Sequence, residues 1–90
     1  MNIISIGDIY AVHTGAYAGE MIICVGVEGK DYCFLATPTM VNRKIPRAIL
    51  EHGRNQGIIK YVEQAPDYVL EVSKAQYKLN EDSNKKIKFC

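Results

Sequence analysis

The sequence has no long apolar segment. Its longest apolar run without a charged residue, 21–27, is seven residues, whereas a membrane-spanning helix needs about 20. The first residues, MNIISIGD, have neither the basic region nor the small-residue cleavage site of a secretory signal. We therefore expect a cytoplasmic protein that does not associate with a membrane.

Cysteine is also scarce, with only Cys24, Cys33 and Cys90 in the chain. The first two lie in hydrophobic runs, where a free thiol behaves as a small buried apolar group. None of the cysteines or histidines shows the short paired spacing of a structural zinc site. We expect reduced structural thiols, no bound metal and no cofactor.

The local motifs of common enzymes are missing. The glycine-containing stretch 15–19 lacks the Lys-Ser/Thr pair of a phosphate-binding loop and does not lead into a helix. His13 and His52, the only histidines, have no serine or cysteine context typical of a triad. Cys24 could act as a nucleophile beside His13, but its apolar neighbours favour an inert thiol. These absences favour a protein that is not an enzyme.

The composition is that of one small globular domain, spanning residues 1–90. Apolar residues make up 48% of the chain and charged residues 23%, and 90 residues provide material for a single core. The net charge of +1 hides an uneven distribution, because residues 42–60 carry five basic side chains against Glu51 alone. Such a compact basic segment suits an acidic or anionic partner.

Alternating apolar residues predict several short strands. The first lies within 3–14, with Ile6, Asp8, Tyr10 and Val12 on one face. The segments 20–28 and 31–37 predict a central β-hairpin, because both faces of each carry apolar residues. Further strands are predicted at 57–63 and, as a short edge strand, at 87–89.

Two helices are predicted. Ile45 and Pro46 lead into a short helix over 47–52, which Gly53 is placed to end. Pro66 and Asp67 open a second helix to about residue 80. The apolar stripe of this second helix consists of Val69, Val72, Gln76 and Leu79, which we expect to pack on the core. A strand at 68–72, and a stripe that binds a partner, are the alternatives.

These elements predict a mainly β (α+β) fold. Four or five short strands are too few for a sandwich and fit a small SH3-like barrel, with a short connector helix and a C-terminal helix.

One stretch of the sequence is similar to known families. The opening Gly7-Asp8-Ile9-Tyr10-Ala11-Val12, followed by Gly15 and Gly19-Glu20, resembles the first strand of PemK/MazF toxins and of KOW modules. The segments LATPT at 35–39 and IPRAI at 45–49 are also similar to the toxin family. The resemblance covers about residues 7–50 and implies an SH3-like barrel.

For the toxin family, the resemblance also implies RNA cleavage. These toxins use an arginine at the start of the second strand together with a Thr or Ser at the end of the third. Thr37 or Thr39 matches the hydroxyl residue, but Glu20-Met21-Ile22 occupies the place of the arginine. Under this hypothesis the catalytic site is degenerate, or it is rearranged so that Arg43 or Arg47 supplies the cation.

The preferred hypothesis is a non-catalytic binding module. Its predicted binding residues lie in the basic connector 42–54 and in the first loop: Tyr17, Arg43, Lys44, Arg47 and Arg54. The partner would be an acidic protein or a nucleoprotein, and nucleic acid could stack on tyrosines. Small proteins of this kind include phage- or plasmid-encoded inhibitors of host machinery, and a homodimer is compatible with the sequence. The alternative is a solvated connector that binds nothing.

Overall fold

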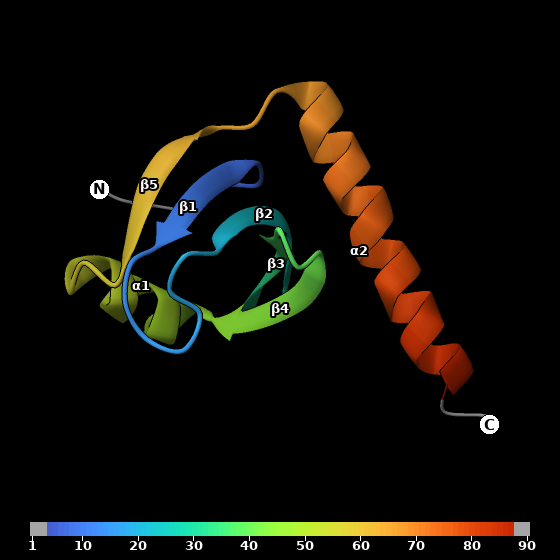
Figure 1. The fold of residues 1–90 in the computed structure, drawn as a ribbon, viewed down its shortest axis with the longest axis horizontal. Coiled ribbons are helices and arrows are strands. Elements are labelled where there is room, and N and C mark those ends of the chain that lie inside the picture. Colours follow the sequence, from blue (N-terminus) through green and yellow to red (C-terminus); the bar gives the residue numbers. More distant parts are fainter. Residues whose placement is uncertain (1–3, 88–90) are drawn as a thin grey trace.

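The protein is a small α+β domain, seen in a computed structural model that describes residues 4–87, with side chains as far as Asp82. It has five strands, two helices and the architecture of a small SH3-like barrel (Figure 1). The elements are β1 (Asp8–Val12), β2 (Met21–Glu28), β3 (Asp31–Thr37), β4 (Val41–Pro46), α1 (Arg47–Asn55), β5 (Ile59–Gln64) and α2 (Asp67–Ile87). Neither described helix is long and apolar enough to cross a membrane. The predicted fold class is confirmed.

All neighbouring strands are antiparallel, in the order β4-β3-β2-β1-β5. Three successive hairpin-like connections join β1 to β4, and β5 then returns to pair with β1. The edge strands β4 and β5 are connected by α1, which lies beside the open end of the curved sheet (Figure 1).

The sheet is apolar on both faces, as the alternation in the central hairpin predicts. On β2, Ile22 and Cys24 face the inner layer, while Ile23 and Val25 face the outer layer. On β3, Phe34 belongs to the inner cluster and is completely buried. The hairpin is therefore central, with β2 and β3 both covered on two sides.

The inner layer is closed by α1. Pro46 precedes the helix and lacks the N–H that the first turn would leave unpaired. Leu50 is the one side chain of α1 that belongs to the inner cluster, which also includes Tyr10 and Ile59. Gly53 is the other buried residue of α1, and most of the remaining residues are exposed, so this helix covers the barrel end only partly.

The outer layer is closed by α2, which stands against the opposite face of the sheet (Figure 1). Its contact face includes Val69, Leu70 and Tyr77, which pack on the outer cluster. Side-chain amides fix its middle to β4 and to the turn before that strand. Asn42 Nδ2 donates to Tyr77 O at 2.9 Å, and Asn80 Nδ2 donates to Met40 O at 2.7 Å. The prediction of a helix after Pro66 is confirmed.

Five details of the sequence prediction were wrong. The helix α2 continues past residue 80 to Ile87. Residues 41–46 form β4, because pairing with β3 outweighs the weak strand pattern of this basic segment. The helix α1 continues past Gly53 to Asn55. Of the predicted packing stripe, Val72 and Leu79 point to solvent, 64% and 60% exposed. At 87–89, Ile87 ends α2, and the rest of the predicted edge strand lies outside the described residues.

The buried Cys24 thiol makes stability sensitive to alkaline pH. Burial raises its pKa to about 11, above the usual 8.5 or so of an exposed thiol. As the pH rises, this thiol therefore ionises in the unfolded chain before it ionises in the folded protein. The free energy of unfolding is not reduced by this group below about pH 8.5, and it falls as the pH rises from there to about 11. We expect a loss of about 2–3 kcal/mol over this range.

Urea denaturation in reducing buffer at pH 8 and pH 10.5 measures this loss. The Cys24→Ala variant should lose less stability over the same interval, because it has no buried thiol to ionise on unfolding. Burial also raises the pKa of Tyr10 and Tyr77, but both phenols are present in both proteins. Equal losses in the two proteins would contradict the prediction.

Candidate functional site

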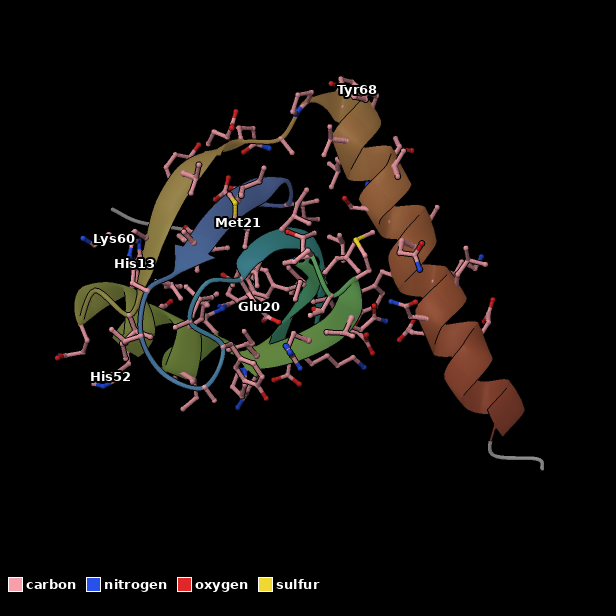
Figure 2. All side chains as sticks on the ribbon, in the orientation of Figure 1. His13, Glu20, Met21, His52, Lys60 and Tyr68 are labelled. Carbon is pink, nitrogen blue, oxygen red and sulfur yellow. The ribbon has the colours of Figure 1, made fainter. Side chains whose placement is uncertain are left out.

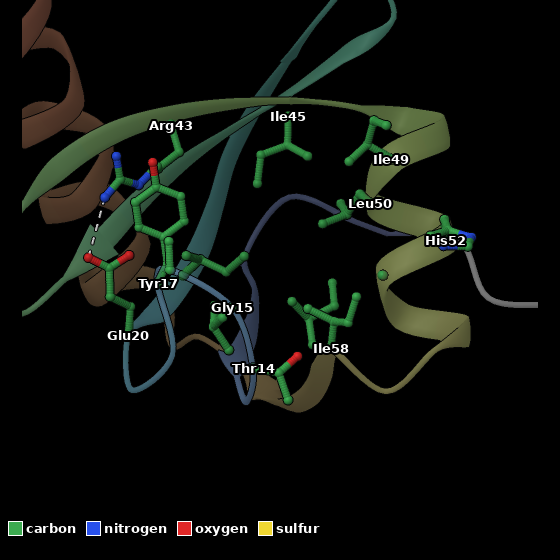
Figure 3. Close-up of a pocket in the computed structure, with 15 residues that line it drawn as sticks. Thr14, Gly15, Tyr17, Glu20, Arg43, Ile45, Ile49, Leu50, His52 and Ile58 are labelled. Carbon is green, nitrogen blue, oxygen red and sulfur yellow. Dashed lines mark hydrogen bonds and ion pairs between the residues drawn. The ribbon is translucent and has the colours of Figure 1, made fainter.

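A cavity of about 400 Å³ opens at the end of the barrel that α1 covers only partly. It lies between the β1–β2 loop, β4 and α1, with Tyr17, Glu20 and Arg43 at one end and mostly aliphatic side chains at the other (Figure 3). Its aliphatic lining residues are Val12, Ala16, Ile22, Ile45, Ile49, Leu50, Ile58 and Ile59.

The β1–β2 loop is folded back beside this cavity by its own backbone. Gly19 N donates to Val12 O at 2.9 Å, and Val12 N donates to Glu20 O at 2.9 Å. Gly15 and Gly19 have φ of 93° and 95°, a region that side-chain-bearing residues rarely adopt. The two glycines thus allow the tight loop that presents Tyr17 at the cavity.

The polar end of the cavity is built around Glu20. The Arg43 Nη2 atom lies 3.4 Å from Glu20 Oε2, and Thr39 Oγ1 donates to the same oxygen at 3.2 Å. The Arg43 guanidinium also stacks on Tyr17, with its central carbon 4.0 Å from the ring centroid. The Glu20 side chain is only 12% exposed, so the ion pair is largely shielded from water.

Two atoms of this ion pair have unused hydrogen-bonding capacity. Glu20 Oε1 and Arg43 Nε are buried and have no hydrogen-bond partner among the described residues. Buried polar atoms in folded proteins are usually paired with protein groups or ordered water, so Glu20 Oε1 can accept one further hydrogen bond and Arg43 Nε can donate one.

The predicted binding residues do not form one cluster. Tyr17 and Arg43 meet at the cavity, as described. Lys44 projects from the opposite face of β4, where its Nζ atom lies 3.2 Å from Glu28 Oε2. This hydrogen bond lowers the pKa of the Glu28 carboxyl and raises the pKa of Lys44.

The other two predicted arginines are located on α1. Arg47 is its first residue, and its guanidinium carbon lies 5.6 Å from the centroid of the Tyr32 ring. Arg54 is near the other end of the helix and hydrogen-bonds Tyr10. The predicted basic connector is thus a strand followed by a helix, and its basic side chains contact different groups on different faces of the domain.

The two threonines of the toxin hypothesis, Thr37 and Thr39, donate hydrogen bonds to different groups. Thr37 Oγ1 donates to Met21 O at 3.2 Å, a contact between β3 and β2. Thr39 shares the Glu20 carboxylate with Arg43. Because β4 runs antiparallel to β3, Arg47 lies at the far end of this pair of strands from Thr39. Only Thr39 and Arg43 of that predicted set come together.

The remaining candidates have ordinary environments. His52 lines the α1 end of the cavity (Figure 3). Cys24 is fully buried, its thiol donates to Gly26 O at 3.6 Å, and its raised pKa keeps it protonated and unreactive. Within residues 4–82, no three His, Cys, Asp or Glu side chains are grouped as metal ligands would be.

Sequence reasoning missed most of the cavity. Ile49 and Ile58 are 62% and 36% exposed at its edge, yet they lie in segments that we interpreted as a connector helix and a strand. The sequence marks Glu20 only as a residue in the place of the toxin arginine. A signal was present in Ile45 and Ile49, which are apolar residues four positions apart in a segment that carries four basic residues.

Comparisons with protein-family models, curated proteins and solved structures gave no match. The resemblance to PemK/MazF toxins and KOW modules therefore stays a prediction.

Proposed function

We propose that this protein is a non-catalytic binding module that holds an apolar side chain of a partner protein in the cavity beside α1. The observation that carries the proposal is the cavity itself. Its volume of about 400 Å³ is within the range of about 300–1,000 Å³ that ligand pockets occupy. Its lining is largely apolar, as such pockets usually are.

The surface around the cavity supports this function. Tyr17, Ile49 and Ile58 are 51%, 62% and 36% exposed beside the opening. Apolar side chains grouped around a hollow are typical of protein interaction sites, whereas single exposed apolar residues are not. Tyrosine and arginine are also common in the energetic centres of interfaces, and Tyr17 and Arg43 lie together here.

The basic residues favour an acidic partner. Arg43, at the polar end of the cavity, and Arg47, exposed at the start of α1, lie on either side of Ile45, which lines the cavity. Carboxylates that flank the inserted side chain would gain long-range attraction from these cations, which raises the association rate more than the affinity. The proposed target is therefore an acidic protein segment with one bulky apolar residue.

Selection from a displayed library of random peptides, followed by calorimetry, tests this function. We expect selected peptides to share a bulky apolar residue among acidic ones. The Ala16→Trp variant should bind them at least about 100-fold more weakly, because the indole would occupy the cavity. Ala16 is exposed in the loop, so the variant should fold normally.

Ala18→Trp is the matched control. Ala18 is exposed in the same loop and is not one of the lining residues, so this variant should bind about as well as the wild type. Equal binding by both tryptophan variants would remove the cavity from the proposal, as would a selection that yields no apolar consensus.

A second candidate function is favoured by the polar end of the cavity. Thr39, which the resemblance to PemK/MazF toxins matches to the hydroxyl residue, and Arg43, which would supply the cation in a rearranged site, meet at Glu20. A carboxylate, a guanidinium and a hydroxyl in contact could together transfer a proton and stabilise a developing phosphate charge. Intact RNA after incubation with the purified protein would exclude this candidate and leave the binding module.

A further inference from the structure

The outward face of α2 carries a regular apolar stripe that the barrel does not use. Tyr68, Val72 and Leu79 are 73%, 64% and 60% exposed, and Ala75 between them is also exposed. Figure 2 shows Tyr68 on the first turn of α2, where the helix follows the segment from β5. The four residues are spaced by four, three and four positions, as in the seam of a coiled coil.

This stripe is distinct from the face that holds α2 on the sheet. The packing face contains Leu70, Ser73 and Tyr77, which lie on nearly the opposite side of a helix with 3.6 residues per turn. The domain is therefore closed without the stripe. Three large apolar side chains in register on one free helix face need an explanation other than the packing of the barrel.

The stripe is complementary to itself when two copies of α2 run antiparallel. In a pair centred between Ser73 and Lys74, Tyr68 of one copy lies opposite Leu79 of the other, and Val72 lies opposite Ala75. A two-fold axis then relates identical surfaces, as in most homodimers. The bulky residues lie at the two ends of the stripe, with smaller ones at its centre.

The charges beside the stripe favour the same arrangement. Glu71 and Lys78 are both exposed on one flank of the stripe, seven residues apart. In the antiparallel pair this flank faces the same flank of the second copy, so each Glu71 approaches the other copy's Lys78. In a parallel pair in register, Glu71 would instead approach Gln76, which is uncharged. Within one chain Glu71 already contacts Lys74 at 3.5 Å, at the surface.

We infer that α2 is a self-association surface, through which two copies of this chain pair as antiparallel helices. The contact spans about three helical turns and is smaller than that of a stable dimer, so the dissociation constant should be on the order of 100 μM. The inference is independent of the cavity, which opens beside α1 on the other side of the sheet.

Sedimentation equilibrium between about 10 μM and 1 mM tests the inference. The wild type should form a dimer over this range, and Leu79→Lys should weaken it at least about tenfold by placing a charge in the seam. Ile49→Lys is the control, since Ile49 is equally exposed, at 62%, but lies on α1. It should leave the dimer unchanged. Both positions are solvent-exposed, so both variants should fold.

Charge reversal tests the antiparallel arrangement. Glu71→Lys and Lys78→Glu should each weaken the dimer by about threefold to tenfold at low salt, and the double variant should recover the wild-type affinity. A wild type that is monomeric at 1 mM would overturn the inference. So would a Leu79→Lys variant that dimerises normally, or a double variant as weak as the single ones.

Discussion

Replacing Phe34 with alanine should lower the free energy of unfolding by about 3–5 kcal/mol, the usual cost of removing a buried phenylalanine from a core. Phe34 is among the largest fully buried side chains, with no exposed surface. It lies on β3, which pairs with both β2 and β4, and its ring lies 6.3 Å from that of Tyr32. The inner layer would therefore lose its central side chain.

A domain of this size is stabilised by only about 5–15 kcal/mol, so the Phe34→Ala variant should be partly unfolded at moderate temperature. Urea denaturation followed by circular dichroism measures the change. Val27→Ala in the same hairpin is the control, because Val27 is 47% exposed and should lose little. A loss below about 1.5 kcal/mol for Phe34→Ala would show that the inner layer is not packed around this ring.

Replacing Arg43 with methionine should cost about 2–4 kcal/mol, because it leaves the Glu20 carboxylate largely buried without its cation. The Arg43 side chain is 27% exposed and that of Glu20 is 12% exposed, so some solvent screening remains. The loss of stacking on Tyr17 adds to the effect. The same urea experiment measures it.

A double-mutant cycle separates the ion pair from the loss of packing. Adding Glu20→Gln to Arg43→Met removes the unpaired charge and should restore part of the stability, with a coupling energy of about 1–3 kcal/mol. Lys44→Met is the neighbouring control, since the pair that Lys44 makes with Glu28 is exposed at the surface and contributes little. Additive effects of the two substitutions would show that Glu20 and Arg43 do not depend on each other.

The central hairpin and the helix after Pro66 could be predicted because their signals are local. Alternation over 20–37 marks two strands with apolar faces on both sides, and Glu28-Gly29-Lys30-Asp31 marks the turn between them. The strand β4 could not be predicted in the same way. Its six residues, VNRKIP, include two adjacent charges and a proline and show no regular alternation, and it is a strand because residues 31–36 of β3 pair with all of it.

The orientation of α2 was beyond local reasoning for a different physical reason. The helix has two apolar stripes, one through Leu70 and Tyr77 and the other through Val72 and Leu79. Either could cover a sheet, and the choice depends on contacts with distant residues such as Asn42. The candidate site could not be predicted for the same reason, because it also depends on residues distant in the sequence. Tyr17 and Arg43 are 26 positions apart, and only the folded sheet brings them together.

The two buried cysteines occupy opposite sides of one sheet. Cys24 belongs to the inner cluster beneath α1, and Cys33 belongs to the outer cluster beneath α2. A thiol reagent reaches a buried sulfur only when the layer above it opens. Peptide mass spectrometry can follow labelling at Cys24 and Cys33 separately. The rate at Cys24 would thus report how often α1 moves away from the sheet, and the rate at Cys33 would report the same for α2, without an introduced probe.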